Sequence, residues 1–387
     1  MYIPRALATQ LRRAAATRPS IIVTGARQVG KTTLLKAVFP DASYVTFDNI
    51  LNVASAQDAP NAFLQRFDGP VILDEVQYVP ALFSAIKQKI DENRDRCGQW
   101  LLTGGQRFEL MKKVSDSLAG RIAVFHLETL SAKELRESGA IDSMEFAAIL
   151  FRGGYPELWA HGDVDKASWF EDYFKTYIER DLKEIVNVRS LVEFRRFMGL
   201  AAARCGELVN FSELGQACGV TNNTVKTWIA ALELSGLIYV LPPYHSNTSK
   251  RLVKMPKLYF ADTGLVTSLL GIRGEEELIA SSFAGHLWEN FVLTELIKTE
   301  DRIPGRDLFY YRDHSGVEID FVLAQPEGLT LIEAKHTERV RSERLSFEKA
   351  EANALGRVVK RRVAALTGMS QSLPMDGFDI YDPRFGS

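Results

Sequence analysis

The sequence predicts an α/β protein whose amino-terminal part is a parallel sheet sandwiched between helices. That part holds five short apolar runs rich in β-branched residues, at 21–25, 43–48, 70–77, 99–105 and 121–127. Each run has the length of a buried strand. Helical stretches such as 31–39 and 81–91 separate them, and strands that alternate with helices form parallel sheets. Ligands of such sheets bind at the carboxyl ends of the strands, where the motifs below fall.

A glycine-rich loop follows the first predicted strand and fits the spacing G-x-x-x-x-G-K-[ST]. In TGARQVGKTT, the required residues are Gly25, Gly30, Lys31 and Thr32. Backbone N–H groups of such a loop surround a phosphate, and the helix N-terminus behind it favours negative charge. We expect Lys31 to reach the β- and γ-phosphates and the Thr32 hydroxyl to bind Mg²⁺. A glycine turn that binds nothing is the alternative. The sequence therefore predicts ATP and Mg²⁺ as ligands. The expected nucleotide-binding segment is Gly25, Ala26, Arg27, Gln28, Val29, Gly30, Lys31, Thr32 and Thr33.

A pair of acidic residues ends the third predicted strand, in VILDEVQ. Asp74 is expected to hold Mg²⁺ through water, and Glu75 to act as the general base on the attacking water. Thr103 or Gln106, after the next strand, is a candidate for orienting that water, with a plain turn as the alternative. Arg121 and Arg152 are candidates for neutralising the γ-phosphate, with a surface ion pair as the alternative for each. If either acts from a neighbouring subunit, hydrolysis requires a homo-oligomer.

Composition excludes some partners. Lys and Arg number 47 against 49 Asp and Glu, so the net charge of -2 gives no global attraction to nucleic acid or anionic lipid. No apolar run approaches the length needed to cross a bilayer, so we expect no membrane partner. The cysteines Cys97, Cys205 and Cys218 are scattered, which favours a reducing compartment. The expected location is the cytoplasm.

The second half changes texture after about residue 130. Helical stretches come first, at 131–139, 145–158 and 172–186. Residues 207–241 then read as a helix, a turn, a helix capped by Thr221 or Asn222, and a strand, which is the order of a winged helix. A long helix at 283–298 precedes three predicted strands, at 307–312, 316–325 and 329–335.

Several segments carry a resemblance to a known family: TGARQVGKTTLL, ILDEVQ, LLTGGQRFELM, LAGRIAVFHLETLSAKEL and FRGGYPEL. They resemble a group of bacterial and archaeal AAA+ ATPases that end in a domain of unknown function, over nearly the whole chain. The GGYPE segment is similar to the Gly-x-Pro element of related signalling ATPases, which approaches the nucleotide from a lid. By that analogy Tyr155 and Pro156 contact adenine; a helix-breaking turn is the alternative.

Four residues of the last third resemble the PD-(D/E)XK nuclease superfamily. They are a helix glutamate, Glu289, a strand aspartate, Asp320, and the pair Glu333 and Lys335 of LIEAK. Glu333 and Lys335 lie two apart, so they share one face of their strand. The resemblance implies that the three carboxylates bind Mg²⁺ and that Lys335 positions or deprotonates water. A cross-strand ion pair on a solvated face, or a binding module that has lost cleavage, remains open.

Two functions therefore remain open. In the first, an AAA+-type P-loop NTPase, residues 1–130, is followed by a helical lid and linker (131–190), a winged helix (191–265) and a restriction-endonuclease-like α/β domain (266–387) that acts on DNA. The recognition helix would carry Asn222, Asn223, Lys226 and Thr227. The wing would carry Lys250, Arg251, Lys254 and Lys257. In the second, the ATPase is a switch whose inactive nuclease-like domain binds protein partners.

Overall fold

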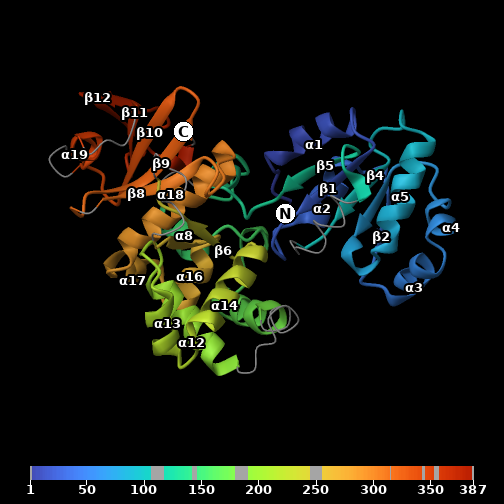
Figure 1. Cartoon of the computed structure of the whole chain (residues 1–387), viewed down its shortest axis with the longest axis horizontal. Helices are drawn as coiled ribbons and strands as arrows, with labels where there is room; N and C mark the ends of the chain where they lie inside the picture. Colours follow the sequence, from blue (N-terminus) through green and yellow to red (C-terminus); the bar gives the residue numbers. More distant parts are fainter. Residues whose placement is uncertain are drawn as a thin grey trace. The chain divides into compact units, whose positions relative to one another are not determined.

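The computed structural model describes residues 2–105, 117–141, 146–178, 191–244, 255–313, 315–341, 345–352 and 357–385. Contacts between Cα atoms divide the chain into two compact units (Figure 1). The first comprises Met1–Leu130 with Leu234–Gly236, and the second comprises Ser131–Glu233 with Leu237–Ser387. The finer division into four domains stays a prediction.

The first unit alternates strands and helices as the sequence predicts. Its strands are β1 (Ser20–Thr24), β2 (Ser43–Thr46), β3 (Val71–Asp74), β4 (Trp100–Thr103) and β5 (Ile122–His126). Its helices are α1 (Leu7–Ala15), α2 (Lys31–Val38), α3 (Ile50–Asp58), α4 (Pro60–Leu64), the 3₁₀ turn η1 (Val76–Tyr78) and α5 (Ala81–Glu92). Each strand overlaps a run that the sequence marks as apolar.

These five strands form one parallel sheet in the order β2-β3-β4-β1-β5. All four pairings are parallel, and Ser20 of β1 lies beside Trp100 of β4 and Ile122 of β5. The strand β4 therefore lies between the glycine-loop strand β1 and the acidic strand β3. This arrangement confirms the predicted P-loop NTPase fold with an added strand, and it brings the carboxyl ends of β1, β3 and β4 to one edge.

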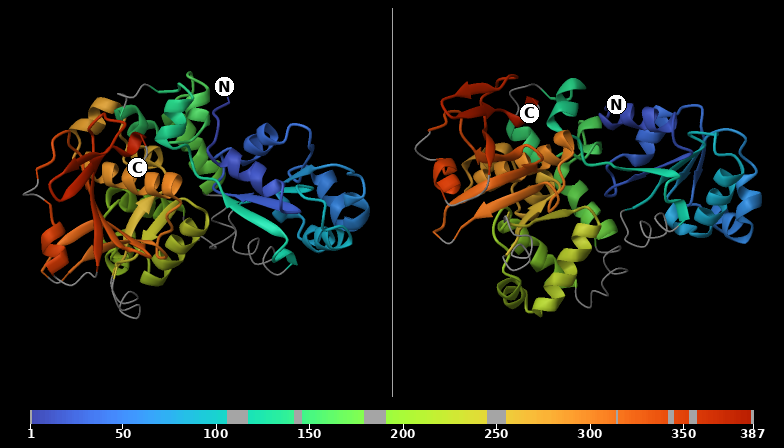
Figure 2. Two further views of the ribbon diagram at one scale, coloured as in Figure 1. Left: turned by 90° about the horizontal axis from the view of Figure 1, so that it is seen from above. Right: turned by 45° about the horizontal axis from the view of Figure 1, so that its top comes forward.

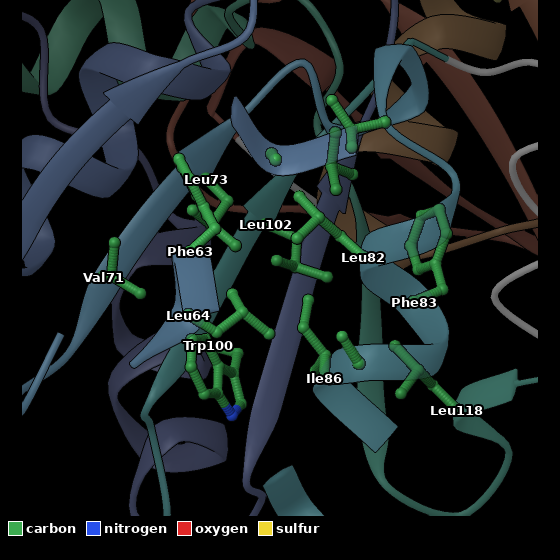
Figure 3. Packing of buried hydrophobic residues seen from close by; sticks show 14 of the residues in the cluster. Phe63, Leu64, Val71, Leu73, Leu82, Phe83, Ile86, Trp100, Leu102 and Leu118 are labelled. Atoms are coloured by element: carbon green, nitrogen blue, oxygen red, sulfur yellow. The ribbon is translucent and has the colours of Figure 1, made fainter. Parts of the chain in front are cut away.

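Alternate side chains of the strands fill the two faces of this sheet. Leu73 of β3 and Leu102 of β4 belong to a buried cluster with Leu82 and Ile86 of α5 (Figure 3). The neighbours Ile72 and Leu101 are equally buried but point to the opposite face, because successive strand side chains alternate. Contacts of α2 with β3 and β4 cover the sheet as well. Each such buried leucine or isoleucine contributes about 1.5–3 kcal/mol, so the sheet edge that carries the motifs is rigidly supported.

The second unit begins with helices and ends with a sheet. Its helices are α7 (Ala132–Glu137), α8 (Phe146–Arg152), α9 (Glu157–Ala160), α10 (Lys166–Tyr173), η2 (Phe174–Ile178), α12 (Leu191–Ala203), α13 (Phe211–Cys218), α14 (Asn222–Leu234), α16 (Thr263–Leu269), α17 (Glu275–Ala280), α18 (Ala284–Glu300), α19 (Phe347–Ala352) and η4 (Pro383–Phe385). Its strands are β6 (Ile238–Leu241), β7 (Lys257–Phe260), β8 (Leu308–Arg312), β9 (Glu318–Gln325), β10 (Gly328–Lys335), β11 (Val358–Ala365), β12 (Leu373–Met375) and β13 (Phe378–Tyr381).

A mixed six-stranded sheet dominates this unit (Figure 2). Its order is β12-β13-β11-β10-β9-β8. The strand β9 pairs antiparallel with both β8 and β10, and β10 pairs parallel with β11. The long helix α18 contacts β10. A glutamate of α18 can thus meet acidic residues of β9 and β10. The order of α13, α14, β6 and β7 agrees with the winged-helix expectation, which remains a proposal.

The structure differs from the sequence expectations at two helical stretches. The predicted helix 145–158 is two helices, α8 and α9, separated by a turn at Gly153 and Gly154. The predicted helix 172–186 contains the π-helical turn η2, and its residues from 179 onward lie outside the described residues. The helical spacing of apolar residues continues across both stretches. The glycine pair is therefore the only sequence signal for the turn between α8 and α9.

Candidate functional site

The glycine loop, residues 25–30, leaves β1 in a conformation that only glycine permits at its first position. Gly25 has φ of +145°, and a Cβ there would lie 2.3 Å from the carbonyl oxygen of Leu127. Gly30 has φ of +93° and caps the N-terminus of α2. The loop thus turns tightly into the helix, which leaves the first N–H groups of α2 available to an anion.

Lys31, the first residue of α2, lies over the loop. Its Nζ donates to the carbonyl oxygens of Gly25 at 3.1 Å and Ala26 at 2.9 Å. Burial lowers the pKa of Lys31, and the carboxylates of Glu75 and Asp74 oppose that shift. A buried ammonium with two nearby carboxylates is suited to a polyphosphate and its metal ion, whose charges it balances.

The two side chains expected at Mg²⁺ are in contact. The Thr32 hydroxyl donates to Oδ1 of Asp74 at 2.7 Å. The Tyr44 hydroxyl donates to Oδ2 of the same carboxylate at 2.9 Å, and burial and Asp74 raise the pKa of Tyr44 to about 12. Hydroxyl and carboxylate oxygens are the ligands that Mg²⁺ prefers. The residues present therefore fit a magnesium ion bound beside the loop.

Thr103, at the end of β4, joins the two acidic residues of β3. Its hydroxyl donates to Oδ1 of Asp74 and accepts a hydrogen bond of 3.0 Å from the backbone N–H of Glu75. Glu75 has a left-handed φ of 57°, and its Oε2 accepts a hydrogen bond from Gln77. This unusual backbone directs Glu75 away from the strand axis. Thr103 thus lies beside Asp74 and Glu75. Its role in orienting the attacking water stays a prediction, and the other candidate, Gln106, lies outside the described residues.

The loop has further support from Arg5, His126 and Glu128, which belong to none of the predicted motifs. Arg5 is buried and donates to the carbonyl oxygens of Val29 at 2.8 Å and Glu128 at 2.6 Å. His126 lies 2.9 Å from Glu128 and 3.3 Å from the Thr24 hydroxyl. Burial alone would lower the pKa of His126, but Glu128 raises it above its ordinary value. Of these three residues, only His126 could be singled out from the sequence, because it lies at the end of a predicted strand.

The nuclease-like residues meet where α18 crosses β9 and β10. Lys335 Nζ lies 2.6 Å from Glu333 Oε2 and 4.0 Å from Asp320 Oδ2. The other Glu333 oxygen accepts a hydrogen bond from the backbone N–H of Ser346, and the Glu333 residue is 2% exposed. Burial and the charge of Glu289 raise the pKa of Asp320 to about 6. The predicted residues Glu333 and Lys335 therefore form an ion pair in which the carboxylate is buried and the lysine is partly exposed.

A second lysine enters the same cluster from β7. Lys257 Nζ lies 2.9 Å from Glu289 Oε1 and 2.5 Å from Glu318 Oε1. The Tyr259 hydroxyl donates to Glu289 Oε1 at 2.6 Å. The Lys257 side chain is 4% exposed, so its charge depends on these partners. The expectation that Lys257 lies on an exposed wing is wrong, because its strand places it in the interior.

A cavity of about 620 Å³ opens beside this cluster. Its lining includes Glu289, Asp320 and Lys335, together with His286, His336, Arg339 and Arg341. Among the described residues, no three His, Cys, Asp or Glu side chains are grouped so that they could hold a metal ion. Each of the three predicted carboxylates, Glu289, Asp320 and Glu333, accepts an internal hydrogen bond, and their role as a metal set stays a prediction.

Comparisons with known proteins agree with the division of the chain into an amino-terminal ATPase unit and a second unit. Residues 17–136 match the family described as an AAA domain, and residues 143–276 and 284–379 match two domains of unknown function, DUF8612 and DUF4143. The chain is similar to the uncharacterized proteins Rv2008c of Mycobacterium tuberculosis and Mb2031c of Mycobacterium bovis. Identity is 31% over 319 residues, which is 82% of this chain and 70% of each relative. The chain belongs to the AAA+ ATPase family with a carboxyl-terminal domain of unknown function. The fold and the AAA domain support ATP binding and hydrolysis.

This AAA+ protein is also similar to solved structures. The Walker-type ATPase PABY2304 of Pyrococcus abyssi is 16% identical, with a TM-score of 0.44, over 69% of this chain and 96% of that one. The RuvB Holliday junction branch migration motor of Thermotoga maritima is 18% identical, with a TM-score of 0.35, over 65% and 95%. Likenesses at these scores carry no argument about function.

The GGYPE segment of the AAA+ protein has a structural role. Tyr155 is 1% exposed, and its hydroxyl donates to that of Tyr173 at 3.0 Å within an aromatic cluster that includes Trp169. The expectation that the Tyr155 side chain contacts adenine is therefore wrong, because that side chain is enclosed within its own unit. Pro156 caps α9 and is half-buried, so it marks the helix-breaking turn that was the alternative.

The two candidate arginines differ in their surroundings. Arg121 forms a two-pronged ion pair with Asp91, at 2.9 and 3.0 Å. It precedes β5, whereas the glycine loop follows β1, and these strands are parallel. About 13 Å of strand separates the two ends, so Arg121 does not reach a nucleotide on its own loop. Arg152 lies over the Trp159 ring, with its guanidinium carbon 5.4 Å from the ring centre.

The basic segments expected to bind DNA are partly engaged. On α14, Asn223, Lys226 and Thr227 are exposed, while Asn222 donates to Ser212 at 3.2 Å. Lys250, Arg251 and Lys254 lie outside the described residues. Apart from these expected segments, basic side chains of β11 are paired with acidic ones, as Lys360–Asp379, Arg361–Glu351 and Arg362–Glu300. Within the described part of the chain, no helix is long and apolar enough to span a bilayer.

Proposed function

We propose that this AAA+ protein binds and hydrolyses Mg²⁺-ATP in the cytoplasm, and that its nucleotide state controls a carboxyl-terminal unit that acts on DNA. One observation carries the ATPase assignment. Thr32, Asp74 and Thr103 form a hydrogen-bonded chain that ends at the backbone of Glu75. A magnesium ligand pair and a general base are thereby fixed on one edge of a rigid sheet, which is what hydrolysis of a bound triphosphate needs.

Each residue has a separate role in this mechanism. The loop N–H groups and Lys31 bind the β- and γ-phosphates. Thr32 and Asp74 would hold the magnesium ion, which when bound would supply positive charge against the transferred phosphoryl group. Glu75 accepts a proton from the attacking water. Thr103 fixes the backbone N–H of Glu75 and, through it, the direction of that carboxylate.

The proposal of DNA as the substrate rests on the cavity in the second unit. Lys335, Arg339 and Arg341 line it, and Arg339 and Arg341 are exposed. Cationic side chains at the mouth of a cavity are suited to a phosphate backbone. The exposed residues Asn223, Lys226 and Thr227 on α14 offer a second contact surface.

One experiment tests both parts. ATP turnover is measured with Mg²⁺, with and without duplex and single-stranded DNA at two salt concentrations, while DNA integrity is followed in the same tubes. We expect turnover that DNA stimulates and that falls as salt rises, because phosphate contacts release counterions. The control Lys31→Ala removes turnover without affecting DNA binding. Turnover that ignores DNA in every condition would contradict the DNA assignment and point to a protein partner.

A further inference from the structure

The carboxylate cluster of the second unit contains its own cation. Glu289, Glu318 and Asp320 come from α18 and β9, and Lys257 reaches them from β7. Lys257 contacts two of these carboxylates directly and interacts electrostatically with the third. A cation held by converging carboxylates and shielded from water is the arrangement in which a divalent metal ion is ordinarily found.

The ammonium is firmly held in this position. Its side chain is 4% exposed, and a buried lysine that keeps its charge needs such partners. Burial by itself lowers the pKa of Lys257, but Glu289, Asp320 and Glu318 together raise it above its ordinary value. The tyrosine neighbour Tyr259 adds a hydrogen bond to Glu289 Oε1, the oxygen that Lys257 also contacts.

The remaining carboxylate of the nuclease-like set is also engaged. Glu333 accepts from Lys335 and from the backbone N–H of Ser346, and Asp320 Oδ2 accepts from the backbone N–H of Ala334 at 2.8 Å. Binding of a metal ion by Glu333 would therefore break its ion pair with Lys335, in which the Glu333 side chain is 3% exposed and the Lys335 side chain 33% exposed. Such a step leaves Lys335 without its closest partner.

We propose that the ammonium of Lys257 fills the cation position of the Glu289–Asp320 cluster, so that the adjacent cavity binds a phosphodiester through its own cations and without a divalent metal ion. Arg339 and Arg341 supply the exposed positive charges, and Lys335 lines the same cavity. This choice of ligand rests on the proposed action on DNA. The role of Lys257 does not.

Metal binding tests the proposal directly. Binding of Mn²⁺ to the full-length chain without nucleotide is measured by electron paramagnetic resonance, comparing the wild type with Asp320→Ala. We expect the two titrations to coincide, since the cluster holds no Mn²⁺ in either. Any Mn²⁺ bound near Asp74 appears equally in both. A wild-type Mn²⁺ site that Asp320→Ala removes would overturn the proposal.

Removal of the internal cation provides the complementary test. Lys257→Met should create a Mn²⁺ site at least tenfold tighter than any in the wild type, and the double variant Lys257→Met/Asp320→Ala should lose it. Lys257→Arg, which keeps the charge, should gain no site. A folded Lys257→Met chain that gains no Mn²⁺ would contradict the proposal. If circular dichroism shows that Lys257→Met does not fold, the comparison with Asp320→Ala still decides.

DNA binding separates this inference from the proposed function. Fluorescence anisotropy with a labelled duplex is measured in Mg²⁺ and in excess EDTA, without nucleotide. Equal affinity in both supports metal-free binding, and Arg339→Ala with Arg341→Ala should weaken it at least tenfold. Affinity that is lost in EDTA would overturn this inference but leave the DNA assignment standing. Absence of binding in either buffer would contradict the DNA assignment, and the Mn²⁺ titrations would still test Lys257.

Discussion

Thr103 is the side chain that connects Asp74, the proposed magnesium residue, to Glu75, the proposed general base. Its hydroxyl donates to Asp74 and accepts from the N–H of Glu75. A hydroxyl can do both at once, whereas a methyl group can do neither. The position of the Glu75 carboxylate therefore depends on a residue that touches neither water nor phosphate in the mechanism that we propose.

Replacement of this hydroxyl should affect hydrolysis more than binding. We expect Thr103→Val to lower kcat by about 10- to 100-fold, because small displacements of a catalytic group have effects of that size. The matched control Thr103→Ser should keep most of the activity. Steady-state ATPase kinetics, with nucleotide affinity measured separately, check this. A loss of ATP affinity with kcat unchanged would mean that Thr103 serves binding alone.

Lys31 should show the opposite pattern. Lys31→Ala removes the only charged side chain of α2 that the P-loop motif directs at the phosphates, and two charge-assisted hydrogen bonds of about 1.5–3 kcal/mol each are lost with it. We expect ATP affinity to fall at least about 100-fold with the circular dichroism spectrum unchanged. Equilibrium binding of a fluorescent ATP analogue measures it. Undiminished affinity would disprove the assigned nucleotide site.

Sequence patterns identify side chains whose chemistry has a fixed spacing. Lys31, Thr32, Asp74 and Glu75 follow from motifs, and the structure brings Thr32 and Asp74 into contact. Arg5 could not be predicted, because its contacts with Val29 and Glu128 depend on where the first helix packs. The same holds for Tyr155, whose motif resembles a nucleotide contact but whose environment is aromatic and closed.

At the scale of elements, the turn between α8 and α9 is closely packed against the start of α16. Gly153 has φ of +76°, and a Cβ on it would lie 2.0 Å from Asp262 Oδ1 and 2.7 Å from the backbone nitrogen of Gly264. Asp262 caps α16 and also accepts from Gly154 at 2.7 Å. The turn and the helix cap therefore share one buried carboxylate, and this close approach leaves no room for a Cβ on Gly153.

Gly153→Ala should destabilise the second unit. We expect a loss of about 3 kcal/mol or more, since both strain and overlap oppose the new methyl group. Gly139→Ala is the matched control, because Gly139 has φ of +72° but open space around its Cβ position; we expect about 1–2 kcal/mol there. Guanidinium unfolding followed by tryptophan fluorescence measures both. Equal losses in the two variants would show that the packing contributes nothing.

Strands are predicted correctly from the sequence where they are buried in a regular parallel sheet. The five strands of the first unit are confirmed within a few residues, because buried parallel strands are continuous apolar runs. By contrast, the sequence predicts Lys257, the first residue of β7, to lie on the basic wing. Only the acidic partners Glu289 and Glu318, distant in sequence, make that lysine an interior residue.

At the scale of the whole molecule, the position of Arg121 bears on whether hydrolysis needs a second copy of the chain. It lies at the amino ends of the strands, and its own glycine loop lies at the carboxyl ends. If Arg121 neutralises a γ-phosphate, it does so on a neighbouring copy of the chain, and hydrolysis then depends on assembly.

Mixing two inactive variants tests this dependence. Arg121→Ala retains an intact loop and Glu75, while Glu75→Gln retains Arg121. If the arginine acts between subunits, mixing the two should restore ATP turnover to well above the sum of the separate values, and wild-type specific activity should rise with protein concentration. Each variant alone serves as the control. A mixture no more active than its parts, together with full activity of Arg121→Ala, would exclude this role.

The central claim is that Glu75 drives hydrolysis of Mg²⁺-ATP held by the glycine loop. The most direct measurement is release of inorganic phosphate by the wild type and by Glu75→Gln, with ATP binding determined on the same preparations. We predict that Glu75→Gln binds ATP as tightly as the wild type and releases phosphate at least about 100 times more slowly, as expected for loss of a general base. Phosphate release by Glu75→Gln at the wild-type rate would contradict the account.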